Sequence, residues 1–251
     1  MFCVKKEGAR TIVNILGLKI KFINKMALYQ RILNVQTLHS QVFAKYKNCN
    51  AGKDLVLLAT GPSLKDFKPI ENAIYIGVNR AFEYEKVKLD YAFIFDNSNP
   101  TPEYLEALNQ YKGNDAKKFY GICSDFDLLN CTISESDASE ANAERFYLHS
   151  VNNKNIPTYN IAAEAFYNAN SVVFPAIQFA LWTNPKRIYL VGCDTNLNGY
   201  YNSKSKNILK TKSVYNGWLK VKDFSQIFYP KTEIISVNPV GLKGIFQDIY
   251  Q

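Results

Sequence analysis

The sequence predicts an α/β fold: one domain with a mainly parallel sheet, preceded by a basic amphipathic helical segment. Short, continuous apolar runs recur along the chain and are typical of strands buried on both faces. Helical stretches separate some of these runs, which favours a parallel sheet. The 251 residues, 47% hydrophobic and 14% aromatic, suffice to bury one large core.

Five runs are expected to be strands because each is short and almost wholly apolar. They span residues 54–59, 73–78, 91–95, 187–191 and 233–237. A helix is expected over 162–183, despite Pro175, between the third and fourth runs. Ligands of parallel sheets bind just beyond the carboxyl ends of the strands. The residues that follow these runs are therefore the candidate site residues.

The positive charge of the chain is concentrated at its N-terminus. Residues 1–52 hold nine Lys/Arg and one acid, a net charge of +8. Residues 53–251 hold 21 Lys/Arg and 21 Asp/Glu, which cancel. This larger part has no excess positive charge to face a phosphate backbone, so we expect no nucleic-acid partner.

Within residues 1–52, Lys19 and Lys21 interrupt the apolar residues too early for a membrane-spanning helix. No signal-peptide cleavage pattern follows them. The spacing of apolar residues predicts a helix over 26–46. Two interpretations of this segment stay open: a helix that packs on the rest of the protein, or a basic segment that lies on an anionic membrane surface.

The cysteines favour a reducing compartment. There are five, an odd number, without Cys-x-x-Cys spacing. The two histidines, His39 and His149, cannot build a zinc site with such scattered cysteines. We therefore expect a cytoplasmic protein, peripheral on the inner membrane face if the membrane interpretation of residues 1–52 holds.

Polar residues follow four of the expected strands. They are Thr60-Gly61-Pro62-Ser63, Asn79-Arg80, Asp96-Asn97 and Gly192-Cys193-Asp194. Gly61 allows a sharp turn and a close approach of the backbone to a ligand. Ser63 is expected to cap a helix whose first N–H groups bind a phosphate. An ordinary strand–turn–helix connection with a serine cap is the alternative.

These motifs carry a resemblance to a known family. Gly-Pro-Ser-Leu, Val-Asn-Arg and Gly-Cys-Asp resemble, in order and spacing, the bacterial sialyltransferases of glycosyltransferase family 42. They are also similar to uncharacterised bacterial sugar-transferase-like proteins and to pterin-pyrophosphokinase-like domains. The likeness runs from about Leu55 to Ile249. It implies a single Rossmann-like, nucleotide-sugar-binding domain over 53–251, a CMP-linked donor, and neither metal nor other cofactor.

The resemblance also implies roles for single residues. The donor-binding set is Thr60, Gly61, Pro62, Ser63, Asn79, Asn97, Ser171, Gly192 and Asp194. The family's histidine base has no counterpart in residues 213–218. A base must still deprotonate the acceptor, and the candidates are Asp194, Asp96 and His149. Tyr201 is the candidate to steady the leaving phosphate.

Lysines cluster between residues 198 and 222, and no acid lies between Asp194 and Asp223. This loop is either a cationic lid that closes on a nucleotide or an anionic acceptor, or a solvated basic loop. Asp96 is not followed by a second carboxylate in an Asp-x-Asp motif. We therefore expect no bound divalent metal.

Together these features predict a glycosyltransferase. It would move a sugar from a nucleotide-activated donor, a CMP-sugar being favoured, to a bacterial cell-surface glycan or glycolipid such as lipooligosaccharide or capsule. Two alternatives stay open: a Mg-dependent phosphoryl- or pyrophosphoryl-transfer enzyme on the same scaffold, and a non-catalytic nucleotide-binding module. Metal dependence separates the first alternative from the prediction.

Overall fold

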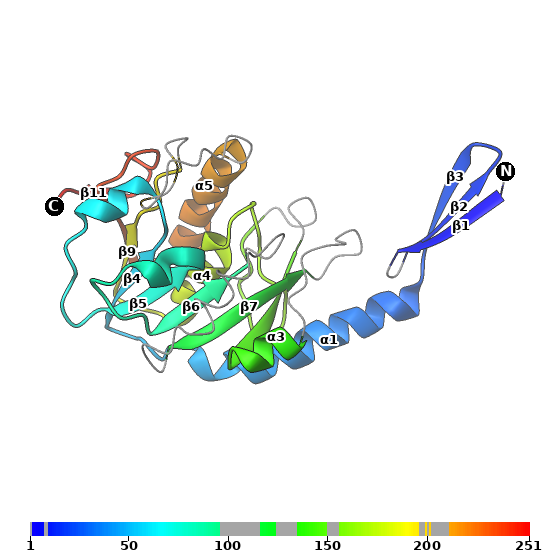
Figure 1. Ribbon diagram of the computed structural model, residues 1–251, viewed down its shortest axis with the longest axis horizontal. Helices are drawn as coiled ribbons and strands as arrows, with labels where there is room; N and C mark the ends of the chain where they lie inside the picture. The colour runs from blue at the N-terminus through cyan, green and yellow to red at the C-terminus, as the bar shows by residue number, and fades with distance from the viewer. Residues whose placement is uncertain are drawn as a thin grey trace.

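The computed structural model describes residues 2–7, 10–95, 116–123, 135–149, 156–195, 199, 201 and 211–251. The chain forms two sheets, a small one near the N-terminus and a large one in the rest of the protein (Figure 1). A long helix, α1 (Lys25–Phe43), lies between them in sequence. The large sheet positions every candidate site residue that the structure describes.

The large sheet has eight strands, and every neighbouring pair is parallel. Its strands are β4 (Asp54–Leu58), β5 (Ile74–Val78), β6 (Tyr91–Ile94), β7 (Lys117–Cys123), β8 (Ala143–Leu148), β9 (Arg187–Val191), β10 (Glu233–Val237) and β11 (Gln247–Ile249). The predicted α/β fold with a mainly parallel sheet is confirmed. The five predicted strands are β4, β5, β6, β9 and β10, while β7, β8 and β11 were not predicted.

The order of the strands is β11-β10-β9-β4-β5-β6-β7-β8. The chain builds outward from β4 to β8 and then returns to place β9 on the other side of β4. The strand order therefore reverses between β4 and β9, and open α/β sheets bind ligands at such a reversal. At the opposite end of these strands, Arg187 donates from Nε and Nη2 to the two carboxylate oxygens of Asp54, at 2.8 and 2.6 Å. This two-point ion pair fixes the register of the two strands.

Both faces of the sheet are covered because successive side chains of a strand point to opposite sides. Leu55 and Leu57 of β4 face α1, α4 (Val173–Trp182) and α5 (Thr211–Phe228). Val56 and Leu58 face the other layer. That layer holds the short 3-10 helices η2 (Pro62–Asp66) and η3 (Asn79–Glu83) and the helix α3 (Glu135–Glu140). A further 3-10 turn, η1 (Ala44–Tyr46), follows α1.

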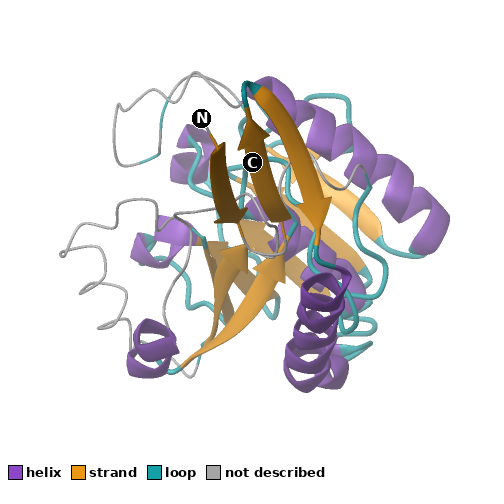
Figure 2. Ribbon diagram, turned by 90° about the vertical axis from the view of Figure 1, so that its right-hand side faces the viewer, coloured by secondary structure: helices purple, strands orange, loops and turns teal. Residues whose placement is uncertain are grey.

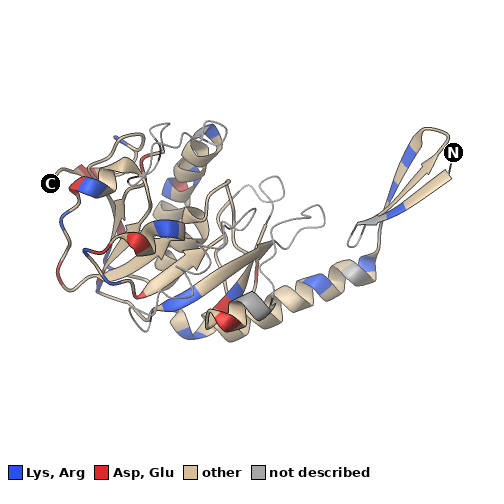
Figure 3. Cartoon of the chain, in the orientation of Figure 1, with Lys and Arg blue, Asp and Glu red and all other residues tan. Residues whose placement is uncertain are grey.

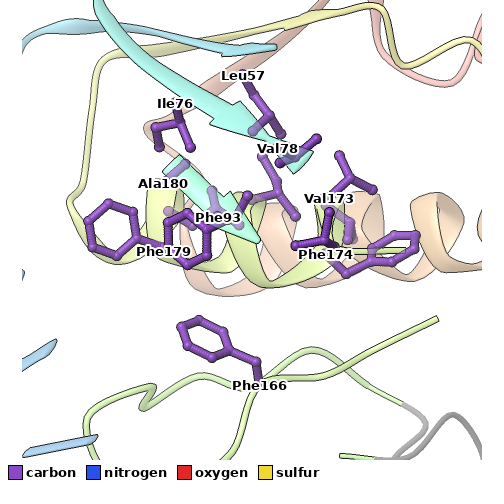
Figure 4. Packing of buried hydrophobic residues seen from close by; sticks show 14 of the residues in the cluster. Leu57, Ile76, Val78, Phe93, Phe166, Val173, Phe174, Phe179 and Ala180 are labelled. Carbon is purple, nitrogen blue, oxygen red and sulfur yellow. The ribbon is translucent and has the colours of Figure 1, made fainter. Parts of the chain in front are cut away.

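Aromatic rings fill the core on the α4 side (Figure 4). The ring centroids of Phe93 and Phe119 lie 4.7 Å apart, and those of Phe43 and Phe166 lie 5.1 Å apart. Phe179 lies 5.2 Å from Phe93. Each such pair adds about 0.5–1.5 kcal/mol beyond the burial of its area. Because Phe43 belongs to α1, the end of that helix is part of this core.

The predicted helix over 162–183 is wrong in its first half, because α4 begins only at Val173. Phe166 instead pairs with the end of β8, where its N–H donates to Tyr147 O at 2.9 Å. Asn170 has a positive φ of 64°, which α-helical backbone does not allow. Pro175 fits within the first turn of α4, where its missing N–H is not needed.

Buried Gln178 of α4 holds this irregular segment. Its Oε1 accepts from the N–H groups of Thr158 and Tyr167, at 2.7 and 3.1 Å. Its Nε2 donates to the carbonyls of Tyr167 and Phe174, at 3.0 and 2.7 Å. All four hydrogen-bonding positions of the amide are used. One side chain thus replaces the hydrogen bonds that a continuous helix would have supplied.

The prediction of helix over the first part of the basic segment is also wrong. Residues 2–23 form an antiparallel three-stranded sheet of β1 (Phe2–Glu7), β2 (Arg10–Ile15) and β3 (Leu18–Ile23). Leu16 and Gly17 both have positive φ, which suits a two-residue hairpin turn. The helix expected over 26–46 corresponds to α1.

Figure 1 shows the small sheet at the far end of α1, away from the large sheet, and in Figure 2 it lies in front, toward the viewer. We call residues 2–34 the arm and the described residues from Val35 onward the body. None of the helices in the described ranges is long and apolar enough to cross a membrane.

Candidate functional site

The chain segments that leave β4 and β9 are held together at the carboxyl edge of the sheet. Beyond the last paired residues, Ala59 N–H donates to Val191 O at 2.8 Å. Gly61 N–H donates to Gly192 O, also at 2.8 Å. The structure thus brings together the two motifs, Thr60–Ser63 and Gly192–Asp194, that sequence analysis placed at separate strand ends.

Ser63 and Asp194 form the centre of this site. Ser63 N–H donates to Asp194 Oδ2 at 2.8 Å, and Ser63 Oγ donates to Asp194 Oδ1. The Asp194 side chain is buried, and this burial raises the pKa of its carboxyl group. The two hydrogen bonds from Ser63 oppose that rise, because they stabilise the charged form. Asp194 therefore joins the two loops as a buried, hydrogen-bonded carboxyl group.

Glycine is required on both sides of this pair. A Cβ at Gly61 would lie 2.5 Å from Gly192 O and 2.7 Å from the Asp194 carboxyl group. Gly192 has a φ of 67°, and a Cβ there would collide with Ala59 O. Side chains would thus push the loops apart and separate Ser63 from Asp194.

The expected helix capped by Ser63 is wrong. The segment forms the five-residue 3-10 helix η2, whose N-cap is Gly61. Ser63 lies inside it, and its N–H is already bonded to Asp194. The N–H of Leu64 donates to Gly61 O. The first turn therefore directs its Ser63 N–H at a carboxylate of the protein itself.

Tyr201 lies beside this pair of loops. Its N–H donates to Thr60 O at 2.8 Å, and its ring contacts the Tyr84 ring edge-on at 6.1 Å. Burial raises the pKa of the Tyr201 hydroxyl, which keeps it protonated as a hydrogen-bond donor. The charges of Glu83 and Arg80 also act on that pKa, so Tyr201 has both charged groups as neighbours.

Arg80 and Asn79 end the neighbouring strand, β5. Arg80 Nε donates to Glu83 Oε1 at 2.7 Å. The pair is exposed, so the Arg80 guanidinium group lies at the rim of the site. Asn79 has a positive φ of 46°, and its Oδ1 accepts from Phe95 N–H at 3.1 Å. That bond uses only the oxygen of the amide. Asn79 thus ties the ends of β5 and β6 together and lies one strand from Ser63.

Ser171 precedes α4 at the same edge of the sheet, next to the start of α5. Asn170 Nδ2 donates to Ser213 Oγ at 3.0 Å. Gly217 of α5 packs so closely that a Cβ would lie 2.8 Å from the Ala169 Cβ. The structure therefore places Ser171 at the carboxyl edge, but no bond links it to the Ser63–Asp194 pair among the contacts of the described residues.

His149 follows β8 and donates its N–H to Phe166 O at 2.8 Å. Four strand spacings separate β8 from β4, about 19 Å across the sheet. The structure therefore does not bring His149 together with Asp194. Asp96 and Asn97 lie outside the described residues, as do Lys204, Lys206 and Lys210 of the predicted lid.

Sequence analysis placed Arg80 at a strand end without giving it a role, and it missed the contributions of Tyr84 and Gly241. Gly241 N–H donates to Asp194 O at 2.8 Å, which brings the turn after β10 against the loop after β9. The signal for Gly241 was its place four residues after the end of a buried strand. Nothing in the sequence indicated that Tyr84 would meet Tyr201.

No group of three or more His, Cys, Asp or Glu side chains within the described ranges is placed to hold a metal ion. No protein-family model matches the chain, and no curated protein matches it significantly.

Proposed function

We propose that this protein is a glycosyltransferase that takes a sugar from a nucleotide-activated donor, a CMP-sugar being favoured. Its acceptor is a bacterial cell-surface glycan or glycolipid, and it acts in the cytoplasm on a Rossmann-like scaffold. The reversal of strand order between β4 and β9 supports a nucleotide site there. The resemblance of the motifs at this point to the family 42 sialyltransferases supports the choice of reaction.

The observation that carries the proposal is the Ser63–Asp194 pair at this reversal. Asp194 makes two hydrogen bonds to Ser63, which leaves acceptor positions on its carboxylate for ribose hydroxyl groups. Gly61 and Gly192 let the two loops pack directly against each other, which holds Ser63 and Asp194 together at the strand ends.

The chemistry assigned to the site is a direct displacement at the anomeric carbon of the donor sugar. The acceptor oxygen forms a bond to this carbon while the bond to the nucleotide phosphate oxygen breaks. The phosphate leaves with the bonding electrons, and hydrogen bonding by Tyr201 and the charge of Arg80 stabilise it. The acceptor proton passes to a carboxylate, for which Asp194 and Asp96 are the candidates.

Calorimetric titration of CMP, CDP, UDP, GDP and ATP, each with and without Mg²⁺, tests the proposal. We expect metal-free CMP binding that Ser63→Ala weakens about tenfold or more, because Ser63 positions the Asp194 carboxylate. Ser40→Ala is the matched control, since Ser40 is an exposed serine of α1. Tight binding of UDP or GDP instead would keep a glycosyltransferase and replace the donor class.

Two results would count against the proposal. Binding of ATP that requires Mg²⁺ would favour phosphoryl transfer, and no binding of any nucleotide would reduce the site to a structural joint between two loops. Asp194→Asn separates the two roles of Asp194. A loss of nucleotide affinity indicates ribose binding, whereas retained affinity with lost transfer indicates a base.

A further inference from the structure

The small sheet of the arm has one mainly apolar face, on which only the positions of Lys6 and Thr11 are not apolar. Residues paired directly across antiparallel strands point to the same face. The register pairs Phe2 with Ile15 and Ile15 with Leu18. It also sets Val4, Val13 and Ile20 in one row and pairs Thr11 with Phe22.

This apolar face is exposed to solvent. Phe2 is 69% exposed, Leu18 64% and Phe22 53%. Leu16, in the turn between β2 and β3, is 85% exposed. An apolar surface of this kind marks an interaction site when it is contiguous, and seven apolar side chains in three adjacent strands make it so.

The opposite face of the same sheet carries positive charge. Lys5 and Lys21 flank Ile12 across the strands, and Lys19 pairs with Asn14. Lys19 and Lys21 are exposed. Figure 3 shows Lys and Arg along the arm, which belongs to the segment that carries the whole net charge of the chain.

Exposed apolar residues also lie on the first half of α1. Met26, Tyr29 and Ile32 are 74%, 57% and 48% exposed. A spacing of three residues keeps them on one side of the helix. Tyrosine is enriched at membrane–water boundaries, where its ring contacts the acyl chains and its hydroxyl contacts water.

We propose that the arm docks on an anionic lipid membrane, with the apolar face of the small sheet lying in the headgroup layer. An apolar face opposite a Lys-rich face is the pattern of segments that lie in this layer. The lysines on the opposite face would then lie within about 10 Å of the lipid phosphates. This is the Debye length at about 0.1 M salt, so their attraction to the phosphates is only partly screened. A positively charged segment complements an anionic surface.

A second copy of the chain fits this face less well. Two copies would bring two segments of net charge +8 close together, and neither would offset the charge of the other. An anionic bilayer supplies the opposite charge instead.

Flotation of the full-length protein with lipid vesicles tests the proposal. One set is phosphatidylcholine alone, and the other contains about 30 mol% phosphatidylglycerol. We expect binding to the anionic vesicles that added salt weakens. Leu18→Thr with Phe22→Thr should lower this binding about tenfold or more, because it removes apolar surface while threonine keeps the strands. Lys19→Gln with Lys21→Gln should lower it about thirtyfold on anionic vesicles only.

Ile227→Thr is the matched control, since Ile227 is 69% exposed on α5 of the body and should leave binding unchanged. Unchanged thermal unfolding of each variant shows that the body has folded. Absence of binding to both vesicle sets, or binding that Leu18→Thr with Phe22→Thr leaves unchanged, would overturn the proposal. So would a dimer in light scattering that this double variant dissociates. Nucleotide titration of the same variants tests the proposed function separately.

Discussion

Similar side chains are buried in the body and exposed in the arm. In the body, Phe93 and Phe166 are fully buried among other rings. In the arm, Phe2 and Phe22 lie more than half exposed. The body covers its sheet on both faces, whereas the small sheet lies apart from the large sheet at the far end of α1 (Figure 1). Apolar residues in the body therefore stabilise the fold, while those of the arm are available for contact with something else.

Gln178 should give the largest loss of stability. Gln178→Leu removes the side-chain oxygen that accepts from the N–H groups of Thr158 and Tyr167 and the amide nitrogen that donates to two carbonyls. We expect a loss of at least about 4 kcal/mol of unfolding free energy. Urea unfolding measures it, with Gln226→Leu on the exposed side of α5 as the control. Equal urea midpoints for both variants would contradict the role of Gln178 in holding the segment before α4.

A pair of glycines compares the two regions directly. Gly192→Ala in the body should cost about 3 kcal/mol, from its positive φ and its collision with Ala59 O. In Gly17→Ala of the arm, the added Cβ has no atom within 4 Å. The only cost is the strain of an alanine at a φ of 91°, a local destabilisation of about 1–2 kcal/mol. Thermal unfolding of the body should therefore change for Gly192→Ala and stay unchanged for Gly17→Ala. A similar shift for both would show that the arm and body unfold together.

His39 holds the second half of α1 against β8 and the segment around Ile161, and this contact should be sensitive to acid. His39 Nδ1 lies 2.8 Å from Ile161 O and must donate to it, while Nε2 accepts from Tyr147 N–H at 2.8 Å. The second bond requires the neutral ring, because a protonated Nε2 cannot accept a hydrogen bond. Burial lowers the pKa of His39 to about 4.

The unfolded chain has the ordinary histidine pKa of 6.5 and so binds the proton first as the pH falls. The contribution of neutral His39 is complete above pH 6.5 and is lost between pH 6.5 and 4, about 2 kcal/mol of it by pH 5. Urea unfolding at pH 7 and pH 5 measures it. His39→Gln should lessen this pH dependence, and an unchanged dependence would contradict the assignment.

The smallest effect on stability is expected from the arm. Leu18→Thr with Phe22→Thr should change the unfolding free energy of the body by less than about 0.5 kcal/mol, because both side chains are exposed. The same urea titration measures it. A loss of several kcal/mol would show that the body depends on the arm.

The sequence predicted those strands of the body that are apolar throughout. It did not predict β7 and β8, since Lys117, Lys118 and Arg145 interrupt their apolar residues. The small sheet was mistaken for helix, although Lys19 to Phe22 alternates with a period of two and Leu16-Gly17 is a turn signal. Short segments of this kind are ambiguous until their partners are known.

For the candidate site, the sequence placed Ser63 and Asp194 at the ends of separate strands. It could not indicate their contact, because pairing of β4 with β9 depends on the order of strands in the whole sheet. The same limit explains why Gly241 was not named, since it reaches Asp194 only after β10 joins β9. Local pattern predicts which residues end strands, and topology decides which ends meet.

The pairing of β4 with β9 also has a consequence for synthesis of the protein. Asp54 and Arg187 are 133 residues apart, and ribosomes add about 5–20 residues per second. During translation, the edge of β4 that pairs with β9 therefore remains unpaired for roughly 7–27 s. Ser63 remains without Asp194 for about as long, so the proposed nucleotide site is assembled late. Retention of a nascent chain on immobilised nucleotide would then report that the central sheet has closed.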